Sequence, residues 1–143
     1  MQIRDERWTS AVFRILSKTI SLEDIFAKIN IQPTGYYKKG EHYSNRNPQS
    51  GIREANLWIL KSNLGDQDTI ESHIEYLISF LEENSNSINE LQSECDFEIM
   101  CAYSSGNGQG GFTLNHEVLR KITEFPVDLS INLYPPSEKP DNL

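Results

Sequence analysis

The chain has 143 residues, with 13 lysines and arginines against 21 aspartates and glutamates, so its formal net charge is -8. This length suits one domain, and two cysteines are too few for a disulfide-stabilised scaffold. The acidic total disfavours nucleic acid as a partner, and no apolar run approaches the ~20 residues that cross a membrane.

A strand and a helix are predicted first. The compact apolar run 11–17 is typical of a strand that is buried on both faces or nearly so. Ser21 then precedes apolar residues at helical spacing and suits a helix N-cap. Because the residue before a proline avoids the helical region, this helix should end by Gln32, before Pro33.

The segment 33–54 changes composition to glycine, tyrosine, asparagine, serine and basic residues, without a sustained helical or strand period. It is therefore predicted to be a long loop, and loops of this length inside a domain are often functional or mobile. Residues 55–62 alternate as a second strand, with Trp58 and Leu60 on one of its faces.

Asp68 or Thr69 is expected to cap the longest helix, whose apolar stripe runs from Ile70 to Leu81. The polar run 84–87 should end this helix, and a short turn over 88–91 should follow. A strand over 95–103 is predicted next, because apolar and polar residues alternate there with period two.

The last elements follow a glycine-rich loop over 104–111. Asn115 is expected to cap a third helix that Pro126 stops, and 127–134 alternates as a strand. Residues 135–143 are polar and are expected to form a disordered tail after a single domain spanning 1–134.

The order strand, loop, helix, strand occurs twice, over 12–60 and 97–134, with the long helix between the two halves. This pattern predicts an α+β fold with a mainly antiparallel sheet, about three helices packed on one face, and two βαβ-like halves.

Several segments, taken in order, resemble a known family: FRI, an SLEDI helix, INIQPT, NLWILKS, FEIMCAY, GGFTLNHEVLRKI and a closing LSINLY. Over about Phe13 to Tyr134 the chain resembles the bacterial domain-of-unknown-function family 4279. The resemblance implies a small intracellular bacterial α+β protein. That family has no established activity, so the resemblance carries no catalytic residue over to this chain.

The motifs that would indicate catalysis or a cofactor are weak. Residues 106–111 satisfy G-x-G-x-x-G, but four residues separate them from the next helix, so a simple connection is favoured over a nucleotide site. The histidines 42, 73 and 116 lack metal-ligand spacing, and the serines occur in caps and turns. We therefore expect no catalytic residue, no metal and no cofactor, and no enzyme is indicated.

The most informative constellation combines aromatic and cationic side chains in and beside the loop over 33–54. Such residues suit an anionic ligand or an acidic protein surface through ion pairing, stacking and cation–π contact, although tyrosines could also simply anchor the loop. The candidate binding residues are Tyr36, Tyr37, Lys38, Lys39, Arg46, Arg53 and Trp58.

The sequence leads us to expect a cytoplasmic, non-enzymatic module that binds another protein, in the manner of an immunity protein whose acidic face covers the basic active site of a toxin. The alternative is a protein that binds a small anionic ligand or a nucleotide through the Tyr/Lys/Arg loop. Residues 1–63 carry 10 basic and 6 acidic residues, whereas residues 64–143 carry 3 and 15, so the charge is dipolar along the chain.

Overall fold

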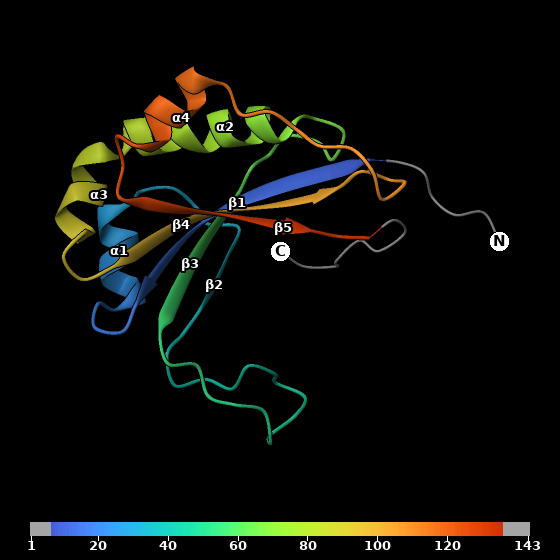
Figure 1. Cartoon of the computed structure of the whole chain (residues 1–143). Helices are drawn as coiled ribbons and strands as arrows, with labels where there is room; N and C mark the ends of the chain where they lie inside the picture. Colours follow the sequence, from blue (N-terminus) through green and yellow to red (C-terminus); the bar gives the residue numbers. More distant parts are fainter. Residues whose placement is uncertain (1–6, 136–143) are drawn as a thin grey trace.

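A computed structural model describes residues 7–135 and shows one five-stranded sheet with four helices in that range (Figure 1). In chain order the elements are β1 (Trp8–Ser17), α1 (Leu22–Lys28), β2 (Gly35–Tyr37), β3 (Asn56–Lys61), α2 (Ile70–Glu83), α3 (Ser85–Leu91), β4 (Asp96–Ser104), α4 (His116–Ile122) and β5 (Val127–Leu133). The strand order is β2-β3-β1-β4-β5, and only the β4–β5 pair is parallel.

The predicted α+β class and mainly antiparallel sheet are confirmed, but the two halves differ. β1 pairs directly with β3 in antiparallel fashion, so the first half is not a parallel βαβ unit. The second half, β4–α4–β5, is parallel. Within the described range there are four helices rather than about three, and residues 136–143 of the predicted tail lie outside that range.

Two further predictions about local structure were wrong. The segment expected to be a turn after the long helix forms α3, which begins directly behind the C-cap Asn84. α4 ends at Ile122 with Thr123 as its C-cap, before Pro126 is reached, and Phe125 packs against the core from outside the helix.

The predicted N-caps are confirmed, since the side chains of Ser21, Thr69 and Asn115 each accept a backbone hydrogen bond from the first turn.

The helices cover one face of the sheet because the apolar side chains of β1, β3 and β4 converge there. In the antiparallel register Phe13 lies between Leu60 and Ile99, and Ile15 lies between Trp58 and Phe97. All these side chains belong to one buried cluster, which also takes in the apolar stripes of the helices. We call this side of the sheet the helix face.

An aromatic cluster joins the longest helix to the centre of this face. The ring of Phe13 lies 5.5 Å from Phe80 of α2, 6.0 Å from Phe97 and 6.3 Å from Trp58, measured between centroids. Trp58 also stacks on Phe80 at 5.8 Å. Because buried aromatic pairs add to the energy of apolar burial, these contacts fix where α2 sits on the sheet.

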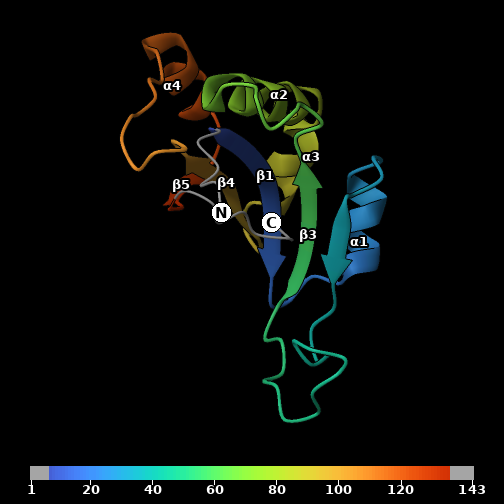
Figure 2. The same ribbon diagram turned by 90° about the vertical axis from the view of Figure 1, so that its right-hand side faces the viewer.

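The opposite side of the sheet, which we call the open face, carries no helix in the described range, and Figure 2 shows β1 and β3 from this side. Its exposure is uneven. Near the start of β1 the ring of Trp8 packs 5.3 Å from Tyr134, and Val12 is buried. Toward the end of β1, Arg14 and Leu16 are half-buried, so this strand is nearly, but not fully, buried on both faces.

A buried polar cluster anchors the start of α2 to β1. The ring of His73 lies 3.1 Å from Thr9 Oγ1 through Nε2 and 2.8 Å from Ser62 Oγ through Nδ1. Burial lowers the pKa of His73, against a smaller raising effect of the Gly65 backbone and Asp68. The folded protein therefore holds this imidazole neutral at pH values where an exposed histidine would be charged.

This arrangement predicts an acid-sensitive stability. Below about pH 6.5 the unfolded chain binds a proton at His73 that the folded chain does not bind, so the free energy of unfolding should fall as the pH decreases through about 6.5. His73→Gln should remove part of this slope in urea unfolding curves. His116→Gln, at an exposed position on α4, serves as the control, and an unchanged slope in His73→Gln would contradict the assignment.

Candidate binding surface

The segment between β2 and β3 is an ordered projection rather than a featureless loop. We call residues 38–55 the arm; in both views it extends away from α2 and α4 (Figures 1 and 2). Its two sides are held by backbone hydrogen bonds from Gly40 N to Arg53 O (3.0 Å), from Arg53 N to Glu41 O (2.8 Å) and from Tyr43 N to Gly51 O (2.9 Å). The arm is thus an irregular continuation of the β2–β3 hairpin.

The base of the arm is fixed to the sheet by one buried amide. Asn56 accepts a hydrogen bond from the backbone N–H of Lys39 (2.8 Å) and donates one to the carbonyl of Ile20 (2.8 Å). Lys39 Nζ also donates to the carbonyl of Lys18 (2.9 Å). These bonds tie the arm to the turn after β1, so its direction relative to the sheet is defined.

A cation–π stack stiffens the middle of the arm. The guanidinium carbon of Arg53 lies 3.8 Å from the ring centroid of Tyr37 and 4.7 Å from that of Tyr43. Each contact of this kind contributes about 0.5–1 kcal/mol at an exposed site.

The structure separates the predicted binding residues into groups. Tyr37 and Arg53 meet in the stack, and the side chains of Lys38, Lys39 and Arg46 are exposed along the arm. Tyr36 points to the helix face, where its ring makes an edge contact with Phe26 of α1 at 5.4 Å.

Trp58 lies on the same helix face as Tyr36 and is 0% exposed, so it packs the core and does not belong to the arm surface. Trp58 is close to the basic segment in the sequence, but in the fold it lies in the core and not at the surface.

Two residues that sequence reasoning did not single out extend the arm surface onto the sheet. Tyr37 pairs with Leu57, and Leu57 pairs with Leu16, so these three side chains form a row across the open face beside the arm. Tyr37 is 42% exposed and Tyr43 is 58% exposed. In the sequence, the charged residue Arg14 interrupts the apolar run of β1. This residue could have indicated that one side of the strand faces away from the core at this point.

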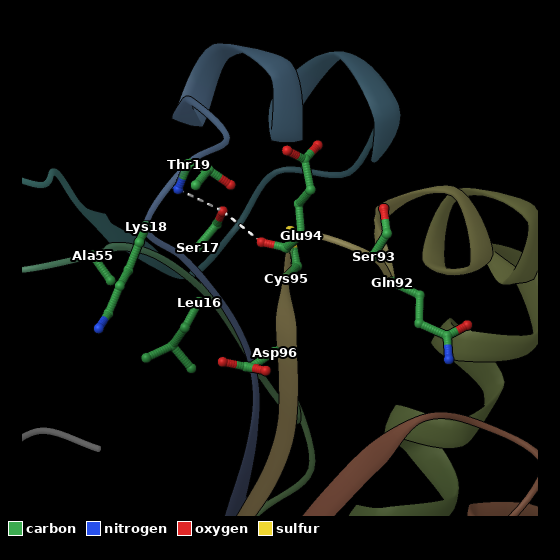
Figure 3. A pocket seen from close by; sticks show the side chains of 10 residues that line it. All are labelled: Leu16, Ser17, Lys18, Thr19, Ala55, Gln92, Ser93, Glu94, Cys95 and Asp96. Carbon is green, nitrogen blue, oxygen red and sulfur yellow. Dashed lines mark hydrogen bonds between the residues drawn. The ribbon is translucent and has the colours of Figure 1, made fainter.

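A pocket of about 450 Å³ lies at the base of the arm, where β1 ends and β4 begins (Figure 3). Ser17 bridges its walls by donating to Glu94 O at 2.8 Å. Lys18, Glu94 and Asp96 are its charged lining residues, so carboxylates outnumber cations. This charge balance disfavours an anionic ligand in the pocket.

The two cysteine thiols are poor nucleophiles. Burial raises the pKa of the Cys95 thiol, and a hydrogen bond with Ser17 offsets only part of the effect. Burial raises the pKa of Cys101 to about 12. Because the thiolate is the reactive form, neither thiol is activated at neutral pH.

The His73 cluster is the nearest resemblance to a catalytic site in the described part of the chain, because an imidazole contacts two hydroxyls. Thr9, Ser62 and His73 are nevertheless at most 3% exposed, and the Asp68 carboxylate accepts a hydrogen bond from Gly65 N rather than orienting the ring. A nucleophile must reach its substrate, so this cluster is structural. Within residues 7–135 no group of three histidine, cysteine or carboxylate side chains is placed to hold a metal ion.

One of the comparisons with known proteins gives a match. The chain matches the model of a domain of unknown function, DUF4279, over residues 6–136, and it belongs to that family. The comparisons with curated proteins and with solved structures give no match. Among the described residues, no helix combines the length and apolar character that a membrane crossing needs.

Removal of the Arg53 guanidinium should loosen the arm without unfolding the protein. Arg53→Ala eliminates both ring contacts, which together contribute about 1 kcal/mol, so local opening should become about fivefold more frequent. Hydrogen exchange of the Tyr43 amide should accelerate accordingly, while core amides of β1 stay unchanged. Arg46→Ala in the same arm is the control, and equal exchange rates in the two variants would contradict the role of the stack.

Proposed function

We propose that this protein is a non-enzymatic binding module that recognises another protein through the arm and the adjoining row of the open face. The observation that carries the proposal is the stack of Arg53 between Tyr37 and Tyr43 on a projecting, hydrogen-bonded arm. Tyrosine and arginine are enriched among the few residues that carry most of the binding energy at protein interfaces. The neighbouring Leu16 and Leu57 add partly exposed apolar area.

The shape of the arm favours a protein partner over a small molecule. Small-molecule sites are concave and enclose most of the ligand, whereas Lys38, Tyr43 and Arg46 are exposed on a projecting arm. The pocket beside its base carries Glu94 and Asp96, which repel anions. A small anionic ligand or a nucleotide therefore remains the competing proposal, with weaker support.

A second candidate interface lies on α2, at the other end of the molecule from the arm (Figure 1). Glu75, Glu82 and Glu83 are exposed there, and their spacing of seven or eight residues places them on one side of the helix. These carboxylates support an immunity-like role, in which an acidic surface covers the basic active site of a toxin. Such complementarity mainly accelerates association and sets specificity.

Site-specific photocrosslinking tests the arm proposal. With p-benzoylphenylalanine in place of Tyr43, irradiation of native-host cells should give a discrete protein adduct, because the group sits on the proposed contact surface. The same group in place of Leu119, an exposed apolar residue of α4, is the matched control. No adduct at Tyr43, or the same adduct from both positions, would contradict the proposal.

The acidic candidate is tested separately in the same cells. With p-benzoylphenylalanine in place of Ser79, which is exposed on α2 between Glu75 and Glu82, an adduct should form if this surface binds a basic partner. Its yield should fall when Glu75, Glu82 and Glu83 are changed to glutamine, since the attraction is electrostatic. An undiminished yield would contradict an interface based on charge.

A further inference from the structure

We propose that Arg53, held between Tyr37 and Tyr43, is a carboxylate-binding site that recognises an acidic segment of the partner protein. This inference rests on the proposed function and adds the chemistry of the partner. It concerns a site on the arm that has no established ligand.

The guanidinium is positioned before any ligand arrives. Two tyrosine rings, at 3.8 Å and 4.7 Å from its central carbon, restrain the guanidinium. The backbone of Arg53 is also held, because its carbonyl accepts a hydrogen bond from Gly40 N and its N–H donates one to Glu41 O. A restrained arginine loses less conformational entropy on binding than a free one. The fork of donors on a planar guanidinium matches the two oxygens of a carboxylate.

The guanidinium also lacks an internal partner. Its Nε is buried and has no hydrogen-bond partner, and no described carboxylate forms an ion pair with Arg53. Arg14, on the open face, differs because it is paired with Glu98. A cation that is partly dehydrated and unpaired gains more from an incoming carboxylate than a fully hydrated one does.

The Arg14–Glu98 pair is an example, on this sheet, of a guanidinium that donates hydrogen bonds to a carboxylate of the same chain. Burial opposes ionisation of Glu98, but hydrogen bonds from Ser130 and Arg14 outweigh it, so the pKa of Glu98 lies below its ordinary value. Ser130 Oγ donates to Glu98 at 2.5 Å. Arg53 has no such carboxylate among the described residues.

The surrounding charges favour an acidic polypeptide over a nucleic acid. Lys38 and Arg46 are exposed on the arm without a carboxylate partner in the described range, which extends the cationic surface beyond one side chain. Glu41 and Glu54 lie among these cations. A continuous phosphate chain would meet these carboxylates, whereas spaced acidic side chains can avoid them.

The test uses the full chain and a fluorescein-labelled octapeptide of glutamate, with an octapeptide of glutamine as the neutral probe. The glutamate peptide should bind more tightly, and Arg53→Ala should weaken that binding about tenfold. Arg53→Lys should also weaken it, because the charge stays but the planar fork is lost. Arg120→Ala, an exposed arginine on α4, should leave the affinity unchanged. Equal effects of Arg53→Ala and Arg120→Ala would overturn the proposal.

A second readout separates direct contact from loosening of the arm. In arginine-selective NMR spectra of the wild-type protein, the glutamate peptide should shift the Nε–H resonance of Arg53 and leave that of Arg14 in place. An unmoved Arg53 resonance at saturation, or tighter binding of an eight-nucleotide oligothymidylate than of the peptide, would overturn carboxylate recognition. Such a failure leaves the Tyr43 crosslink unaffected, so failure of the inference and failure of the proposed function are distinguishable.

Discussion

The structure depends on burial of the helix face of its five-stranded sheet. Phe13 at the centre of β1 brings Trp58, Phe97 and Phe80 together, and this contact holds α2 against the sheet. The apolar stripes of the helices converge on the same face. The end of the open face beside the arm is left half-exposed as a consequence, and this is where the sheet meets Tyr37.

The same arrangement separates charge in space. The cations of residues 38–53 lie on the arm, while the carboxylates of α2 face solvent at the other end of the molecule (Figure 1). Folding therefore preserves part of the charge dipole that is visible along the chain. A net charge of -8 says little about either surface alone, because screening limits each charge to its neighbourhood. Opposite ends of this protein suit partners of opposite charge.

Elements that depend on interactions between neighbouring residues could be predicted from the sequence. Features that depend on contacts between residues far apart in the chain could not. The caps Thr69 and Asn115 mark their helices because their side chains bond the first turn. The order of the arm depends instead on Asn56, which bonds Lys39 and Ile20 across a fold not visible in the sequence. The burial of Trp58 likewise follows from strand register. The stack requires Arg53 to meet Tyr37, which lies sixteen positions earlier in the chain. The sequence therefore showed that aromatic and cationic residues occur in this segment, but not that these two are in contact.

Adjacent residues on β1 give the most direct test of the central claim that the helix face is the packed core while the end of the open face beside the arm is half-exposed. Ile15 is fully buried on the helix face, and Leu16 is half-buried on the open face. In urea unfolding, Ile15→Ala should cost about 3 kcal/mol, within the range for buried aliphatic truncations. Leu16→Ala should cost about 1 kcal/mol or less, because its side chain is already half-exposed to solvent. Equal costs for the two variants would contradict this difference between the helix face and the arm-side end of the open face.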